Sequence, residues 1–252
     1  MKERRSYDTE RNLKLVTTPL VCLSDVSKQF DRIRALDHVS LAIPEGRIIG
    51  LLGPNGSGKT TMLKILAGLY TEYEGSVSID GLRPGAKTKA CVAYLPDSSC
   101  LPEKMLVSDI VRLYEIFFAD FDAEKGRELL ATFAIGLSKT PEEMSKGMID
   151  KLQISLVMAR RARLYLLDEP IAGVDPAARD YIMGTIINNY ADDATVVIST
   201  HLIADIERVL DEVIFLKDGR IVRHETVDEL KAQEGKSVDE VFREEFRMGE
   251  VR

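Results

Sequence analysis

The chain has 252 residues, 45% hydrophobic and 30% charged, enough to bury the core of one large α/β domain or of a domain with a subdomain. Its net charge of −7 argues against a protein that coats nucleic acid through a basic surface. Cys22, Cys91 and Cys100 form no CxxC pair. This argues against a disulfide framework or a zinc site, and we expect a reducing, cytosolic compartment.

Residues 1–18 are polar and aperiodic, so we expect an N-terminal arm without the apolar stretch of a signal peptide. A single domain is expected over 19–246. It opens with strand-like runs at 20–23 and 35–43, and the dipeptide Asp37-His38 is interpreted as turn chemistry. No run approaches the roughly 18 consecutive apolar residues of a membrane span.

Residues 47–69 read RIIGLLGPNGSGKTTMLKILAGL. The apolar run 48–52 predicts a buried parallel strand, and apolar residues at helical spacing after it predict a helix. Between them lies a match to G-x-x-x-x-G-K-[ST], and we expect ATP contacts from Gly53, Pro54, Asn55, Gly56, Ser57, Gly58, Lys59, Thr60 and Thr61. Loop N–H groups, the helix dipole and the Lys59 charge favour a phosphate. The hydroxyl of Thr60 would face Mg²⁺.

The segment 98–161 differs from its surroundings, because helical periodicity replaces strand-like runs. Helices are predicted over 107–118, 123–133 and about 149–159, which indicates a helical insertion between two sheet segments. Strands are expected at 75–80, 91–95, 164–168 and 195–199, with a helix over 176–189. Near the end, 211–247 predicts a hairpin around Lys217–Arg220 and two helices that begin with capping boxes, Thr226-x-x-Glu229 and Ser237-x-x-Glu240.

Two carboxylates follow the apolar run 164–168, in the sequence LYLLDEP. Asp168 would lie at the carboxyl end of a parallel strand, beside the phosphate loop, where such sheets bind ligands. There it can hold Mg²⁺, and Glu169 can take a proton from an attacking water. A solvated strand end is the alternative for an isolated Asp-Glu pair, but the pairing with the Lys59 loop favours a catalytic site.

With these motifs the chain resembles the ATP-binding subunits of ABC transporters, from about residue 20 to 246. The resemblance implies an α/β fold, with a P-loop NTPase core of mainly parallel sheet, an antiparallel β subdomain and an inserted helical subdomain. It also implies that Glu169 is the catalytic glutamate, that His201 contacts the γ-phosphate, and that Asp175 contacts the opposite subunit. Phe30 falls where the family stacks an aromatic ring on adenine; a core phenylalanine at a strand end is the alternative.

The segment Met144–Met148 stands where the family has its signature sequence, LSGGQ. Ser145 and Gly147 are kept, whereas Lys146 replaces the first glycine. The resemblance implies that Ser145, Lys146 and Gly147 meet the ATP of a partner subunit, and the Ser hydroxyl and backbone N–H groups at a helix start suit that role. Variants of this kind resemble the ATPases of bacterial type-2 exporters.

The family pattern has a glutamine, or in some exporter ATPases a glutamate, after the strand that ends in Leu95-Pro96. Here Asp97 stands in register, and Gln29, Gln153 and Gln233 are too distant in sequence to replace it. Asp97 is therefore expected to be a Mg²⁺ ligand together with Thr60 and Asp168. The alternative is that Asp97 merely caps the turn after Pro96.

The resemblance implies an ATP hydrolase that uses ATP and Mg²⁺ and drives a transporter, with export the expected direction. The implied partners are an integral membrane permease and a second ATPase subunit, identical or different, and no nucleic acid. The implied location is the cytoplasmic face of the cell membrane. Two alternatives are a soluble ATP-switched clamp acting in translation or repair, and a subunit that binds ATP but hydrolyses it weakly.

Overall fold

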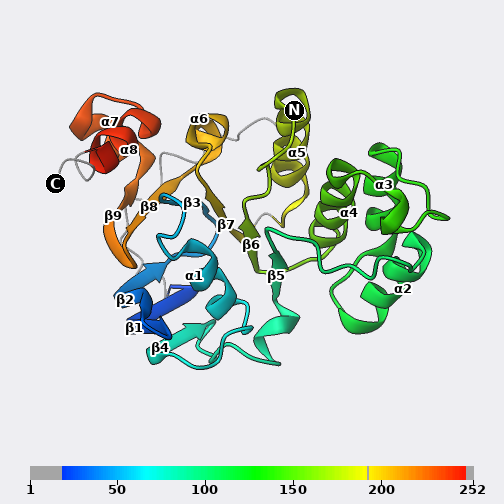
Figure 1. The fold of residues 1–252 in the computed structure, drawn as a ribbon, viewed down its shortest axis with the longest axis horizontal. Helices are drawn as coiled ribbons and strands as arrows, with labels where there is room; N and C mark the ends of the chain where they lie inside the picture. The colour runs from blue at the N-terminus through cyan, green and yellow to red at the C-terminus, as the bar shows by residue number, and fades with distance from the viewer. Residues whose placement is uncertain (1–18, 192, 248–252) are drawn as a thin grey trace.

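A computed structural model describes residues 19–191 and 193–247, so the expected arm at 1–18 lies outside the described residues. Two sheets form the framework (Figure 1). The larger sheet contains, in spatial order, β5 (Val92–Leu95), β6 (Leu164–Asp168), β7 (Thr195–Thr200), β3 (Ile48–Leu52), β8 (Glu212–Lys217) and β9 (Arg220–Thr226). All its pairings are parallel except that of β8 with β9.

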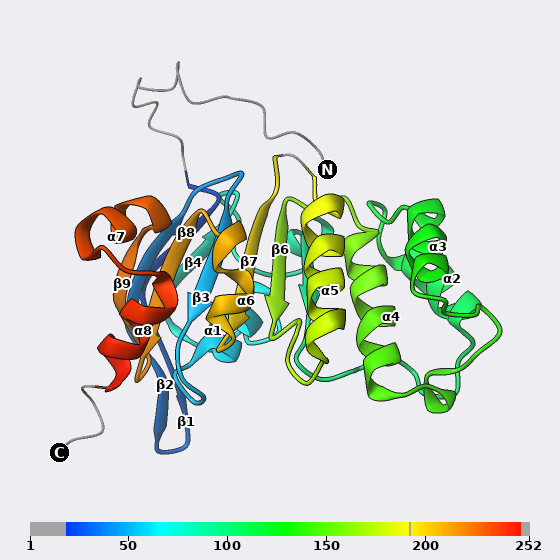
Figure 2. The ribbon, with the colours of Figure 1, turned by 90° about the horizontal axis from the view of Figure 1, so that it is seen from above.

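The central strands β3, β6 and β7 are buried along their whole length and mostly apolar, because both faces of the large sheet are covered. Alternate residues of β3 therefore enter different cores: Ile49 and Leu51 pack on one side, and Ile48 and Leu52 on the other. Helix α1 (Lys59–Leu66) and the small sheet cover the first side. Helices α5 (Pro176–Asn189) and α6 (Ile203–Ile206) cover the second side (Figure 2).

The small sheet is antiparallel and consists of β2 (Ile33–Ile43), β1 (Val21–Phe30) and β4 (Glu74–Ile79). The predicted turn at Asp37-His38 is wrong, because both residues lie inside β2. The register between β1 and β2 shifts at this point, and His38 takes the left-handed conformation with φ 53°. A β-bulge accommodates such a residue within a continuous strand, so turn-like composition here marks a bulge.

The helical subdomain contains α2 (Val107–Phe117), α3 (Ala123–Thr132) and α4 (Lys146–Met158). It lies beside the β5 and β6 edge of the large sheet (Figures 1 and 2). It has a core of its own, which includes Val107, Ile110, Leu130, Leu152 and Leu156. Short 3₁₀ turns at Thr88–Ala90 and Pro141–Glu143 precede β5 and α4.

The C-terminal region begins with the β8–β9 hairpin, whose turn consists of Asp218 and Gly219. Both have positive φ, 48° and 77°, as a two-residue type I′ turn requires. Strand β8 also pairs with β3, so the hairpin is part of the main sheet. Helices α7 (Val227–Glu234) and α8 (Val238–Arg247) follow, both with the predicted capping boxes. Within the described residues, no helix has the length and apolar character needed to span a membrane.

Candidate active site

The phosphate loop connects β3 to α1 and is enclosed by backbone on two sides. A Cβ on Gly53 would lie 2.3 Å from the carbonyl oxygen of Leu216, at the end of β8. A Cβ on Gly58, whose φ is 108°, would lie 2.3 Å from the carbonyl oxygen of Ala35 in β2. Gly219, at the hairpin tip, donates its N–H to the carbonyl of Ser57 (3.0 Å). The hairpin and β2 therefore fix the loop between them.

Lys59 is buried at the start of α1, and its ammonium points back into the loop. Its Nζ donates to the carbonyls of Gly53 (2.7 Å) and Pro54 (3.1 Å). Burial lowers the pKa of Lys59, while the charges of Glu169 and Asp168 oppose that shift. A cation thus lies inside a glycine-rich loop that leads into a helix N-terminus, the arrangement that binds a phosphate.

Asp168 ends β6, and its Cα partner on β7 is Ser199. The hydroxyl of Ser199 donates to Oδ1 of Asp168. Burial raises the pKa of Asp168, hydrogen bonds from Ser199 and Thr60 lower it, and the nearby charges of Asp97 and Glu169 raise it. Among the described residues, Oδ2 of Asp168 is buried with no hydrogen-bond partner.

This oxygen and the adjacent Thr60 hydroxyl fit Mg²⁺, which prefers oxygen ligands. No cage of three or more His, Cys, Asp or Glu side chains exists in the described parts of the chain. Mg²⁺ at nucleotide sites usually takes one or two carboxylates together with water and substrate phosphates, so no such cage is needed. When bound, the ion would neutralise charge on the phosphate oxygens.

Glu169 and His201 contact each other beside Asp168. Nδ1 of His201 lies 3.0 Å from Oε1 and 3.1 Å from Oε2 of Glu169. The backbone of Glu169 has φ 50°, and its N–H donates to both the carbonyl oxygen (3.0 Å) and the hydroxyl (3.1 Å) of Ser199. These bonds hold the carboxylate at the sheet edge, where it can accept a proton from water.

Asp97 follows β5 and Pro96, and the structure brings it to the same edge. It lines a small cavity together with Asp168, Glu169, Lys146 and Asp150. Burial is the main cause of the raised pKa of Asp168, and the charge of Asp97 adds to it. The structure thus places Asp97 beside the two carboxylates, and its role as a metal ligand stays a prediction.

Phe30 ends β1 and is 38% exposed. Its ring meets the ring of Tyr70 edge-on, with 5.3 Å between centroids, and Nζ of Lys28 lies 4.8 Å from its centroid. The ring lies outside the buried clusters of the described residues. It therefore offers aromatic surface at the rim of the molecule.

The signature segment leads into α4: Met144 is buried, Ser145 and Lys146 are exposed, and Gly147 and Met148 are half-buried. Ser145 is the N-cap, and its hydroxyl accepts the N–H of Met148 (3.4 Å). A Cβ on Gly147 would meet open space, whereas one on Gly173 would lie 3.2 Å from Nζ of Lys146. Asp175 is exposed and caps α5 by accepting the N–H of Ala178 (3.0 Å). Ser145 and Asp175 thus each cap the helix that they begin and lie at an exposed helix start.

Residues 36–172 match a family model described as ABC transporter. The ABC transporter ATP-binding protein YtrB of Bacillus subtilis (strain 168) is 32% identical over 217 residues, which cover 85% of this chain and 74% of YtrB. The chain belongs to the ATP-binding subunits of ABC transporters. A solved structure of an ATP-binding subunit of an ABC transporter superposes with a TM-score of 0.80 at 31% identity, covering 89% of this chain and 98% of that one.

This ABC transporter ATPase also resembles a cassette described as dimeric, in a post-hydrolysis state, and bound to ADP and Pi. The TM-score is 0.72 at 27% identity, with 82% of this chain and 98% of the other covered. The fold class predicted from the sequence is confirmed: a mostly parallel sheet, an antiparallel β subdomain and a helical insertion. ATP binding follows from membership of the family.

Sequence reasoning missed three supports of the ABC ATPase site. Ser199 bonds both Asp168 and Glu169. Aligning the predicted strands 164–168 and 195–199 in parallel places Ser199 opposite Asp168, which was the signal for this contact. The hairpin tip at Gly219 backs the phosphate loop, and the sequence carries no signal for that contact. Arg160 joins the helical subdomain to β5. Its position shortly before the buried strand β6 was the only indication of this role in the sequence.

Proposed function

We propose that this ABC transporter ATPase hydrolyses ATP within a head-to-tail dimer and thereby drives a membrane permease that exports its substrate. The observation that carries the proposal is the convergence of Lys59, Asp168, Glu169 and His201 at one sheet edge. Ser145 at the start of α4 offers a further helix start to the phosphate of a second subunit.

The residues of this edge suit attack of water on the γ-phosphate. Lys59 places a positive charge where charge develops on the transferred group. Glu169 accepts a proton from the water while the water oxygen bonds to phosphorus. At the same time the bond between phosphorus and the ADP oxygen breaks. His201, in contact with Glu169, holds that carboxylate in place. Mg²⁺, ligated by Thr60, Asp168 and Asp97, would complete the site.

The second subunit would close the site with its signature segment. The hydroxyl of Ser145 and the backbone N–H groups of Lys146 and Gly147, at the start of α4, would present partial positive charge to an anion. A homodimer and a heterodimer both satisfy this geometry. The similarity to a dimeric cassette bound to ADP and Pi supports the pairing.

An apolar groove supports a permease partner. It has a volume of about 570 Å³ and is lined mainly by apolar side chains, among them Leu101, Pro102, Ile110, Leu113, Tyr114 and Phe117. Beside it, Ile116 and Phe117 are 70% and 71% exposed. The groove lies between α2 and the segment that follows Asp97, and the family resemblance expects the permease at that segment. We assign the groove to an apolar cytosolic segment of the permease.

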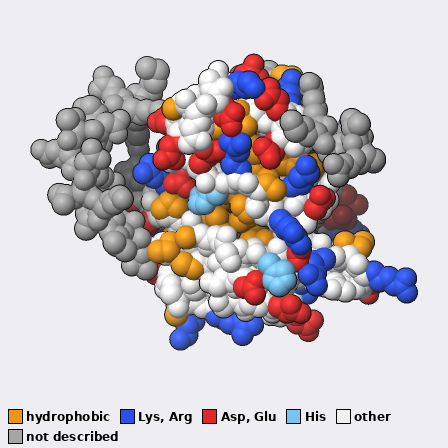
Figure 3. Space-filling model, turned by 90° about the vertical axis from the view of Figure 1, so that its left-hand side faces the viewer, with side chains coloured by type: hydrophobic (Ala, Val, Ile, Leu, Met, Phe, Trp, Pro, Cys, Tyr) orange, Lys and Arg blue, Asp and Glu red, His pale blue; other side chains and the backbone are white. Residues whose placement is uncertain are grey.

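The alternative of an ATP-switched clamp on nucleic acid would require a basic surface. On the face shown in Figure 3, acidic and basic side chains are interspersed, and the net charge of the chain is −7. Neither observation favours nucleic acid as a partner.

Affinity purification from membranes tests the permease. The tagged chain is expected to retain one integral membrane protein, and Phe117→Ser should weaken that binding about thirtyfold, because burial of one aromatic side chain contributes roughly 2 kcal/mol. Val222→Ser is the matched control, since Val222 is also exposed (44%) but lies on β9. Equal retention by wild type and Phe117→Ser would remove the groove from the proposal.

The direction of transport can be measured on the same complex. The proposal of export rests on the resemblance of Met144–Met148 to the signatures of type-2 exporter ATPases. Vesicles with this chain on their outer face, given ATP and a cell extract outside, should accumulate the exported compound, which mass spectrometry would identify. ATP-dependent movement only from inside to outside would establish import.

A further inference from the structure

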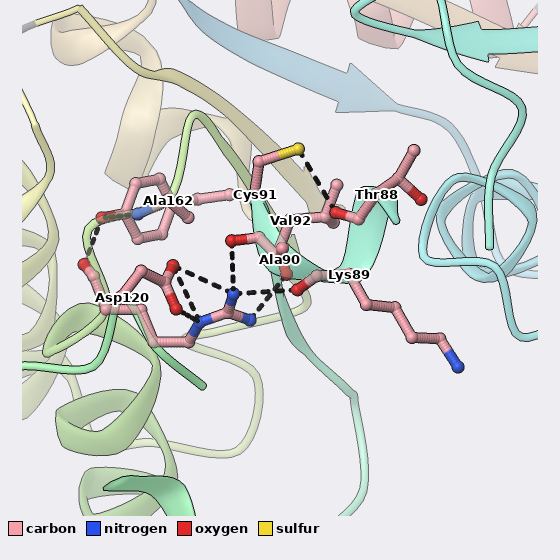
Figure 4. A network of polar contacts seen from close by, with 9 residues as sticks. Thr88, Lys89, Ala90, Cys91, Val92, Asp120 and Ala162 are labelled. Atoms are coloured by element: carbon pink, nitrogen blue, oxygen red, sulfur yellow. Dashed lines mark hydrogen bonds and ion pairs between the residues drawn. The ribbon is translucent and has the colours of Figure 1, made fainter. Parts of the chain in front are cut away.

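Arg160 is buried, 3% exposed, at the junction of the helical subdomain and the large sheet. Figure 4 shows Asp120, Lys89 and Val92 around this junction. Its Nε lies 2.9 Å and its Nη2 3.0 Å from carboxylate oxygens of Asp120. Nη1 donates to the carbonyl of Val92 (2.7 Å), and Nη2 to that of Lys89 (2.9 Å). The guanidinium also lies over the ring of Phe118, 4.1 Å from its centroid. Its donors are thus divided between two parts of the fold.

These contacts join three elements at one point. Arg160 follows the C-cap of α4, which is Ala159. Val92 is the first residue of β5, and Asp120 lies in the turn between α2 and α3. Backbone bonds strengthen the junction: Asp122 donates its N–H to Ala159, and Arg161 donates to Asp120, both at 2.9 Å.

The opposite ends of α4 and β5 carry residues of the proposed ATP site. Helix α4 begins at the signature, after Ser145. Strand β5 leads through Pro96 to Asp97. Lys146 and Asp97 line one small cavity, so the two elements also approach each other at these ends. At the far end Arg160 contacts both elements and can set their relative position there.

We propose that Arg160 is a positioning residue that fixes Asp97 relative to the signature segment, by tying the end of α4 and the α2–α3 turn to the start of β5. The proposal rests on the proposed function insofar as Asp97 and Ser145 act on ATP. An arginine is required, because its planar fork can bond a carboxylate and two carbonyls at once. A lysine would keep the charge but could not serve both sides in fixed geometry.

Phe118 extends the same junction to the apolar groove. Its ring packs on the guanidinium and also lines the groove assigned to the permease. A segment seated in the groove would thus contact a direct neighbour of Arg160.

The test is the distribution of distances between the start of α4 and the end of β5, the two ends that Arg160 does not contact. Spin labels at Ser98→Cys and Glu142→Cys, both exposed positions, would report it by pulsed electron resonance after Cys22, Cys91 and Cys100 are replaced by serine. Glu142 lies just before the signature and Ser98 just after Asp97. Wild type should give one narrow distribution. Arg160→Lys and Asp120→Asn should broaden it, and Arg161→Lys, whose side chain is 74% exposed, should not.

Kinetics separate positioning from general destabilisation. Arg160→Lys and Asp120→Asn should lower kcat by about tenfold to a hundredfold, as misplacement near 1 Å does, while the Kd for ATP of the single subunit changes less than about twofold. Asp120→Asn keeps the guanidinium and its carbonyl bonds, so it tests the proposal even if Arg160→Lys fails to fold. Narrow, unchanged distributions in a folded variant would overturn the proposal. The distances are measured without ATP, so absence of hydrolysis in wild type would count against the proposed function alone.

Discussion

The two halves of the proposed ATP site are built in opposite ways. Lys59 and Asp168 are 6% and 1% exposed, and hydrogen bonds within the chain fix them. Ser145 and Asp175 are exposed, and each bonds only its own helix start through the contacts described here. The first half has the buried, hydrogen-bonded groups of a catalytic site. The second has the exposed groups of a surface that binds another molecule.

The difference follows from what each half must do. Groups that stabilise developing charge act most strongly when they are preorganised away from water. Groups that recognise the phosphate of another subunit must stay accessible until that subunit arrives. In the proposed dimer each chain would contribute a different half to each of two shared sites, so isolated chains should bind ATP but turn it over poorly.

The largest effect is expected from a substitution in the buried half. Glu169→Gln keeps the size of the side chain but removes the base, so kcat should fall by about 10² to 10⁴. ATP affinity should stay within a few-fold of wild type, because Lys59 and the loop are unchanged. Trapped with ATP, the variant should elute as a dimer in size-exclusion chromatography and as a monomer without ATP.

Glu142→Gln is the matched control, since Glu142 is exposed in the helical subdomain, and it should leave kcat unchanged. Undiminished turnover by Glu169→Gln would refute the catalytic role given to this carboxylate.

The buried half was the more predictable from sequence, for a physical reason. A phosphate loop requires its glycines, lysine and flanking elements in one continuous segment, so the motif predicts them together. The supports come from elsewhere in the chain: Ser199 from β7, Gly219 from the hairpin tip and Arg160 from the end of α4. Only tertiary structure brings these together. Likewise, turn-like composition at Asp37-His38 could not distinguish a turn from a bulge.

An intermediate effect tests whether the exposed half acts across subunits. Ser145→Ala and Lys59→Ala proteins should each be nearly inactive alone. Mixed dimers would combine the intact Lys59 of one chain with the intact Ser145 of the other, leaving the second site doubly damaged. Random pairing makes half the dimers mixed, so ATP turnover should recover to about a quarter of wild type. No recovery, with mixed dimers detected by two affinity tags, would place Ser145 outside the shared site.

The smallest expected effect concerns Asp97, which lies at the boundary between the halves. It shares a cavity with Asp168 and Glu169, and also with Lys146 of the signature. A carboxylate is a good ligand for Mg²⁺, but it repels a triphosphate when the metal is absent. It is also one methylene shorter than the glutamine or glutamate of the family pattern. A capping role after Pro96 would produce neither consequence.

ATP affinity of wild type and Asp97→Asn, each with Mg²⁺ and with EDTA, separates these roles. In EDTA, Asp97→Asn should bind ATP about threefold to fivefold more tightly, the size of roughly 1 kcal/mol of charge repulsion at a wet site. With Mg²⁺ the difference should vanish or reverse, because the metal offsets the repulsion and gains a charged ligand in wild type. Asp109→Asn, on α2, is the control and should change neither value. The ratio of the ATP affinity with Mg²⁺ to that in EDTA can be compared between the two proteins. If wild type and Asp97→Asn give the same ratio, Asp97 caps the turn and leaves the metal to Thr60 and Asp168.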